Sequence, residues 1–220
     1  MKTLYSKTNL FLTVQFVFVL LISILLLNET KTDAQVLANG FHSSFFDYVF
    51  YILTHSVEFW GCLIIYILVA TFKNFKFAII GLATYAISGL VTQILKRNVF
   101  SEFKRPTVNI ENLRLIPDFF EYDQNQNFSF PSGHTTVAFS IFIFMTLMVK
   151  NRNWGVLFGL LASLIAYSRV YLSQHYFIDI LVGSIIGSLV TVVSFWGLNK
   201  INFGKWSKKN LLYKKRVTKY

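Results

Sequence analysis

The chain has 220 residues, of which 54% are apolar and only 14% are charged, and its mean hydropathy is positive. A soluble domain of this length needs more polar surface, so the composition indicates an integral membrane protein. The net charge of +11 does not indicate a nucleic-acid partner, because the basic residues gather at the N-terminus, in short connections and in the tail. The single cysteine, Cys62, excludes an intrachain disulfide, and no Cys/His cluster suggests zinc.

Six apolar runs have the length of a membrane-crossing helix, which needs about 20 residues. They lie near 10–27, 57–72, 77–95, 132–149, 154–172 and 177–198. The first run is longer than the apolar region of a signal peptide, so a retained helix is favoured over a cleaved leader. The second run is short and begins beside Glu58, and the aromatic stretch 45–54 before it has the character of an interfacial helix. The sequence therefore predicts an all-α bundle of six transmembrane helices.

Loop charges orient this bundle. The N-terminus, the 73–76 turn, the 150–153 turn and the tail hold 14 of the 21 basic residues and none of the ten acidic ones. By the positive-inside rule these segments are cytoplasmic, and loops 28–56, 96–131 and 173–176 face outward. The basic tail is also suited to anionic lipid headgroups, at about 1 kcal/mol for each Lys or Arg near the surface.

The chain divides into three segments on this basis. Residues 1–56 form an N-terminal helix with an outer interfacial segment, residues 57–198 form the main membrane domain, and residues 199–220 form a basic cytoplasmic tail. The only long polar insertion is 96–131. A loop of that length between closely linked helices is usually functional or disordered, and the residues that bound it favour a function.

His175 and Asp179 stand four residues apart at the start of the last apolar run, so they share one face of a helix. A carboxylate there accepts the proton of one imidazole nitrogen and leaves the other nitrogen free to attack. The helix dipole also favours negative charge in the first turn. Taken alone, the pair is equally typical of a capping Asp beside an interfacial His. Ser168 and Arg169 precede it near the end of the fifth run.

The fourth run opens with Pro131-Ser132-Gly133-His134. Proline suits the first helical turn, and glycine lets the backbone approach a ligand closely. The N–H groups of Ser132, Gly133 and His134 would then form an anion cradle at the positive end of a helix, with His134 as a second titratable imidazole. Taken alone, an ordinary helix start is the more common explanation.

Basic residues follow the third run on the outward side, against the positive-inside trend: Lys96, Arg97, Lys104 and Arg105. Arginine presents a planar fork that matches phosphate oxygens, and lysine acts as a point charge. Headgroup binding explains such charges individually. Lys104 and Arg114 fall outside any pattern and fit solvated loop charges.

The combination is more specific than its parts. Lys…Arg-Pro, Pro-Ser-Gly-His and Ser-Arg-x5-His-x3-Asp together resemble the three-part signature of the type 2 phosphatidic acid phosphatase (PAP2) superfamily, over roughly residues 57–198. The second and third motifs match at every signature position. The resemblance implies a bacterial, multi-pass inner-membrane enzyme without a metal or other cofactor, whose three motifs meet at the outer face and whose substrate is a lipid phosphate among membrane lipids.

The resemblance also implies a role for each motif residue. His175 is the expected nucleophile, Asp179 its orienting partner, and His134 the general acid for the leaving group. Five residues are expected to bind the phosphoryl oxygens: Lys96, Arg105, Ser132, Gly133 and Arg169.

The first motif departs from the family pattern. Six residues usually separate its Lys from Arg-Pro, whereas eight separate Lys96 from Arg105. Either two residues bulge outward and keep Lys96 in register, or Arg97 or Lys104 takes the place of the lysine.

Several substrates and two rival functions fit this pattern. Bacterial members of the family include phosphatases of undecaprenyl pyrophosphate, phosphatidylglycerophosphate, lipid A and phosphatidic acid, and the sequence does not choose among them. A non-catalytic lipid-phosphate binder or transporter built on the same bundle usually lacks a histidine or an arginine, and none is missing here. A vanadate-dependent haloperoxidase shares the anion cage but is mostly soluble.

Overall fold

The computed structural model describes residues 2–111, 113 and 126–212; Arg114 and the end of the basic tail lie outside them. Within these residues the chain is helical and has no β-strand, which confirms the predicted all-α class. The elements are α1 (Lys2–Asn28), α2 (Lys31–Asn39), α3 (Ser44–His55), α4 (Phe59–Phe72), α5 (Phe75–Ile94), a π-helical turn η1 (Leu95–Val99), α6 (Pro106–Asn109), α7 (Gly133–Met148), α8 (Trp154–Tyr171), α9 (Phe177–Leu198) and a 3₁₀ turn η2 (Lys205–Lys208).

Four helices of the described chain are long and apolar enough to cross a membrane, and they lie over Thr8–Asn28, Phe75–Val99, Trp154–Tyr171 and Phe177–Leu198. A fifth span results if α3 and α4 count as one, with a bend of 56° between them. The stretch predicted as an interfacial helix is thus α3, and the weak second run is α4. At 16 residues, α7 is about 24 Å long, which is shorter than the roughly 30 Å of a bilayer core.

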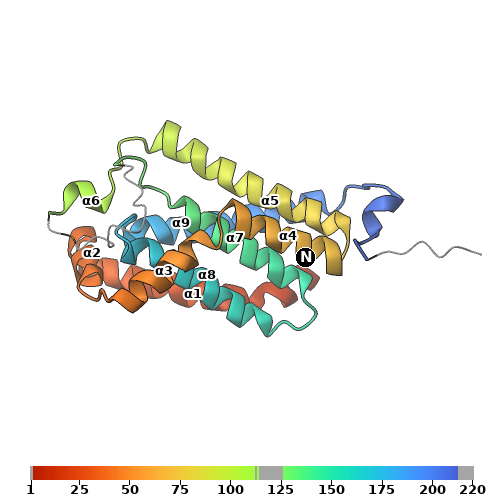
Figure 1. Cartoon of the computed structure of the whole chain (residues 1–220), viewed down its shortest axis with the longest axis horizontal. Helices are drawn as coiled ribbons and strands as arrows, with labels where there is room; N and C mark the ends of the chain where they lie inside the picture. The colour runs from red at the N-terminus through yellow and green to blue at the C-terminus, as the bar shows by residue number, and fades with distance from the viewer. Residues whose placement is uncertain (1, 112, 114–125, 213–220) are drawn as a thin grey trace, which may run out of the picture.

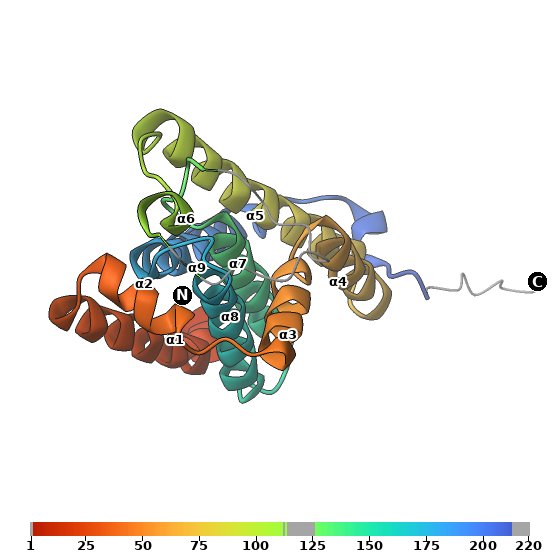
Figure 2. The same cartoon turned by 60° about the vertical axis from the view of Figure 1, so that its left-hand side comes forward.

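Helix α7 is the centre of the bundle, in contact with α1, α5, α8 and α9 (Figures 1 and 2). A Gly-x3-Gly pair, Gly183 and Gly187, lets α9 approach it closely, as small residues do between membrane helices. A β-carbon at Gly187 would lie 2.2 Å from the Thr136 carbonyl oxygen. The sequence pattern therefore fixes α9 against α7, and with it the two helix starts that carry the second and third motifs.

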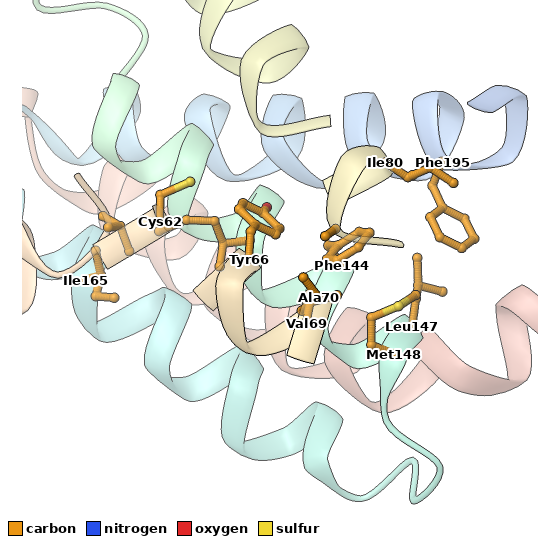
Figure 3. Close-up of a cluster of buried hydrophobic side chains, with 14 residues drawn as sticks. Cys62, Tyr66, Val69, Ala70, Ile80, Phe144, Leu147, Met148, Ile165 and Phe195 are labelled. Atoms are coloured by element: carbon orange, nitrogen blue, oxygen red, sulfur yellow. The ribbon is translucent and has the colours of Figure 1, made fainter. Parts of the chain in front are cut away.

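The apolar core around α7 is formed by side chains of α7 itself, of α4 and α5, and of α8 and α9 (Figure 3). Tyr66 and Phe144 meet edge to face with ring centroids 5.7 Å apart, and Phe195 packs on Phe144 at 6.1 Å. Cys62 is buried in this cluster, as expected of a packing residue. A polar contact also joins α9 to α7, in which the Thr191 hydroxyl donates to the Ser140 hydroxyl over 2.6 Å.

The bundle has two chemically different ends. We call the end that carries segments 29–43, 95–111, 126–132 and 172–176 the polar end, and the end that carries 73–74, 149–153 and 199–212 the basic end. Figure 1 shows α2 and α6 at the polar end and the C-terminal segment at the other. At the basic end, Phe75 donates its N–H to the Lys209 carbonyl over 2.9 Å, which ties the tail to the α4–α5 turn.

Candidate active site

The turn between α8 and α9 places the third motif at the polar end. Helix α8 stops because Ser173 adopts a left-handed backbone conformation, with φ of 53°, a common way to end a helix. The chain then folds back, so that the N–H groups of Gln174 and His175 both donate to the Arg169 carbonyl, over 2.9 and 3.2 Å. The spacing between Arg169 and His175 thus corresponds to one helix end followed by one tight turn.

His175 and Asp179 form a buried pair, as the sequence predicts, but they do not share a helix face, because α9 begins at Phe177 and His175 lies in the turn before it. The distance from His175 Nδ1 to Asp179 Oδ2 is 3.2 Å, and each residue is only 1% exposed. The same carboxylate oxygen accepts the Tyr176 N–H over 3.0 Å and the Ser129 hydroxyl over 2.5 Å. Since an ionised carboxylate only accepts hydrogen bonds, the proton of a neutral His175 belongs on Nδ1, and Nε2 keeps its lone pair.

The surroundings of His175 favour the neutral imidazole. Its burial, and then the positive charges of Lys96, Arg169 and Arg105, hold the pKa of His175 well below its usual value of 6.5. A neutral imidazole with a free Nε2 at neutral pH is the form that can act as a nucleophile.

The second motif begins α7 beside this pair. Ser132 is the N-cap, its hydroxyl accepting the Thr135 N–H over 3.4 Å, and its own N–H donates to the Asp179 carbonyl over 3.1 Å. That contact joins the starts of α7 and α9 directly. It also uses one of the three N–H groups predicted to form the anion cradle, which leaves the role to Gly133 and His134.

The first motif reaches the same place through a wide turn. Residues 95–99 form a π-helix, which accommodates one residue more per turn than an α-helix and often marks functional sites. Lys96 is buried and Arg97 is exposed on the outside of this turn. The π-turn therefore absorbs part of the two-residue excess in the motif and directs Lys96, not Arg97, toward the site.

Contacts between residues 100–105 and 126–130 bring Arg105 to the site. Phe130 packs against the rings of Phe100 and Phe103, with centroids 4.7 and 5.4 Å away. The Ser129 N–H donates to the Phe103 carbonyl over 2.8 Å, and the Arg105 N–H donates to the Gln126 carbonyl over 3.0 Å. The two described ends of the long polar insertion thus pack against each other and set the first motif beside the second.

All three motifs contribute to one cavity of about 500 Å³. Its polar wall holds five of the residues predicted from the motifs, namely Lys96, Arg105, Gly133, His134 and His175. Its opposite wall is formed mostly by α5, with Tyr85, Ala86, Gly89, Leu90 and Gln93. Two predicted phosphate-binding residues, Ser132 and Arg169, are buried close by but do not line the cavity. The Arg169 guanidinium donates to the Thr54 hydroxyl over 2.8 Å.

Four contact residues were not predicted from the motifs. Ser129 donates to Asp179, Gln174 accepts from the Arg105 guanidinium, Thr54 accepts from Arg169, and Glu58 lies 3.0 Å from His134. Ser129 and Gln174 adjoin a motif in the sequence, but spacing alone gives them no partner. Glu58 carried a usable signal, since an acidic residue next to an apolar run of a membrane protein is usually functional.

Comparison with known proteins agrees with this geometry. The model of the PAP2 superfamily matches residues 77–203, and the chain belongs to that family. The lipid A 4'-phosphatase of Bacteroides thetaiotaomicron is 29% identical over 168 residues, which cover 73% of each chain. Undecaprenyl-diphosphatase BcrC of Bacillus subtilis is 37% identical over 108 residues, or 49% of this chain and 48% of that one. The protein is accordingly a PAP2-type phosphatase.

The fold has a solved counterpart. The crystal structure of Aquifex aeolicus LpxE superposes with a TM-score of 0.65 and covers 74% of this chain and 93% of that chain. Sequence identity between the two is 22%, so this likeness establishes the helical arrangement and nothing about the substrate.

Proposed function

We propose that this phosphatase removes phosphate from a membrane lipid through a phosphohistidine intermediate. The observation that carries the proposal is the single cavity in which His175 and His134 meet Lys96 and Arg105. Its apolar α5 wall suits a lipid, whose chain can stay among the helices while the phosphate enters the polar end. Cations and backbone N–H groups then stabilise the negative charge that spreads over the phosphoryl oxygens in the transition state.

Two steps complete the reaction. His175 Nε2 bonds to phosphorus while the bond from phosphorus to the lipid oxygen breaks, and His134 gives its proton to that departing oxygen. Water then attacks the phosphohistidine, His134 takes a proton from that water, and inorganic phosphate leaves. Throughout, the Asp179 carboxylate accepts a hydrogen bond from Nδ1–H of His175 and stabilises the imidazole in the attacking orientation.

The family relatives suggest which lipid to test first. The relative that aligns over 73% of the chain is a lipid A 4'-phosphatase, which favours a phosphomonoester on a lipid A type of headgroup. The higher identity over a shorter stretch to an undecaprenyl-diphosphatase makes a polyprenyl diphosphate the second candidate. Phosphatidyl phosphates are the third.

We also propose six spans with the polar end outside a bacterial inner membrane. We count the short α7 as the sixth span. Because α1, α5, α8 and α9 enclose it, α7 does not have to match the thickness of the bilayer. The support for the orientation is the accumulation of lysines and arginines at the basic end. With Cys62 replaced by Ser, single cysteines at positions 101 and 151 test it. An impermeant reagent should label 101 and not 151 in intact cells with a permeabilised outer membrane, and the reverse pattern contradicts the orientation.

Phosphate release by the purified protein from this panel of lipids is the decisive test of the function. Turnover should survive EDTA, because no group of three or more His, Cys, Asp or Glu in the described residues is placed to hold a metal and the phosphate charge is met by Lys and Arg. Vanadate, which resembles pentacoordinate phosphorus, should inhibit. Tight lipid binding with no release from any member of the panel would favour the non-catalytic binder instead.

A further inference from the structure

The α3–α4 break sets a carboxylate against the second histidine of the cavity. The distance from Glu58 Oε1 to His134 Nε2 is 3.0 Å, and both residues line the cavity, although 76 positions separate them in the chain. A negative charge in a cavity that binds phosphate repels the substrate. The repulsion between this carboxylate and the phosphate must therefore be offset by a favourable effect, and the contact with His134 provides one.

The local backbone is shaped for that contact. Helix α3 packs on α8 and α4 packs on α5, so residues 56–58 cross from one side of the bundle to the other. Gly61 makes this tight break possible, because a β-carbon there would lie 1.8 Å from the Ser56 carbonyl oxygen. Glu58 is the N-cap of α4, yet its side chain accepts no N–H of that helix and is directed at His134.

We propose that Glu58 is a positioning residue for His134. Its carboxylate accepts the hydrogen bond from Nε2–H of His134, which leaves Nδ1 to exchange the proton with the leaving group and with water. The inference rests on the proposed function, in which His134 is the general acid. A carboxylate that accepts from one ring nitrogen fixes which nitrogen faces the substrate and stabilises the imidazolium that must be present before the leaving group departs.

Charge balance gives this role a physical reason. Besides Glu58, the charges that act on His134 are Arg169 of α8 and Lys96 of η1, and His175 lines the same cavity. The two cations oppose a positive charge on His134, although they are needed for phosphate. Glu58 offsets them locally. The same oxygen of Glu58, Oε1, also lies 3.8 Å from Nε2 of the exposed His55.

Leaving-group dependence tests the proposal. Glu58→Gln keeps an oxygen that accepts from Nε2–H but removes the charge, and Glu58→Ala removes both. Against a lipid or other alkyl phosphate we expect turnover to fall about tenfold in Glu58→Gln and further in Glu58→Ala, within the roughly 10²–10⁴-fold that a general acid supplies. With an aryl phosphate whose leaving group needs no proton, only the first step is compared, as the initial burst of released phenol. This burst should stay within about twofold of the wild-type rate in both variants, because His134 is needed there only for the later attack by water.

Two further measurements distinguish the loss of positioning from general damage to the protein. The basic limb of the pH profile with alkyl phosphate should move to lower pH in Glu58→Gln, because the imidazolium loses its counter-charge. In a His134→Ala background, Glu58→Gln should cost nothing more, since its effect passes through His134. Glu29→Gln, which removes an exposed acid at the end of α1, is the matched control and should alter neither measurement.

The outcomes distinguish this inference from the proposed function. Equal slowing of alkyl turnover and of the aryl burst by Glu58→Gln, while His134→Ala retains leaving-group selectivity in the first step, overturns the role of Glu58 and leaves the mechanism standing. Absence of that selectivity in His134→Ala itself overturns the general acid, and with it both statements.

Discussion

The site contains two histidine–carboxylate pairs in opposite physical settings. His175 and Asp179 have side chains that are each 2% exposed, and they come from one turn and the helix start that follows it. His134 and Glu58 have side chains that are 28% and 45% exposed, and they come from distant parts of the chain. One pair is buried among α7, α8 and α9, with His175 at the edge of the cavity, whereas the other lies at the break between α3 and α4.

The difference matches the chemistry proposed for each histidine. A nucleophile benefits from a fixed tautomer and a dry, low-dielectric setting, because the lone pair is then held in one direction and is not solvated. An acid that gives a proton to a leaving group and then takes one from water needs contact with the cavity and with solvent. Burial and exposure are therefore consistent with the two roles that we propose.

Replacing each histidine should give the largest effect and break the comparison most directly. We expect His175→Ala to abolish both turnover and any trapped phosphoenzyme, a loss on the order of 10⁴-fold or more, because no other group forms the bond to phosphorus. His134→Ala should still accumulate phosphoenzyme from an aryl phosphate. Rapid-quench trapping with labelled substrate measures both. If His134→Ala loses the phosphoenzyme and His175→Ala keeps it, the assignment of the two roles is inverted.

Removing the charge of each carboxylate sharpens the comparison. Asp179→Asn should slow the reaction by roughly 10²–10⁴-fold, because the buried imidazole loses its counter-charge and the amide NH2 can face Nδ1, which favours the wrong tautomer. Glu58→Gln should cost less, since its pair is open to solvent. Phosphate release from one alkyl phosphate, measured for both variants, gives the ratio of the two losses in turnover. A larger loss in Glu58→Gln would show that burial does not set the importance of the pair.

The α7–α9 contact that seals the buried pair can be loosened without touching a motif residue. Gly187→Ala puts a β-carbon 2.2 Å from the Thr136 carbonyl oxygen, so α9 must move away from α7. Overpacking of this kind costs about 1–3 kcal/mol, seen as a lower unfolding temperature in detergent. Gly197→Ala on the same helix meets nothing within 4 Å and is the matched control. Equal melting of the two variants would contradict the close packing.

The smallest expected effect concerns pH. Because burial and then Lys96 hold the pKa of His175 below 6.5, protonation should inactivate the nucleophile only below that pH. Lys96→Met removes one cation, so the pKa of His175 should rise and the acid limb of the aryl phosphate profile should move to higher pH. Lys104→Met, an exposed lysine that is not among the charges acting on His175, is the control. The substrate titrates identically in all three proteins, so an unmoved limb would contradict the electrostatic argument.

The sequence alone determined the parts of the site that depend on local geometry. The four-residue spacing predicts that Asp179 meets His175, and the pair forms, although His175 lies in the turn before the N-cap Tyr176 and only Asp179 is on α9. Proline, serine and glycine at the start of the fourth run predict the beginning of α7, and apolar run lengths predict most of the spans. Each of these follows from backbone geometry within a few residues, which the order of amino acids fixes directly.

Tertiary structure decided the contacts between distant segments. That Lys96 and not Arg97 enters the cavity follows from the π-turn. The bend of 56° between α3 and α4 and the contact of Glu58 with His134 follow from how α3 and α4 pack on different neighbours. Such contacts depend on where helices cross, which is set by the summed packing of many side chains and by no single spacing. The sequence therefore predicted the proposed nucleophile and its partner, whereas only the fold brought Glu58 beside the proposed acid.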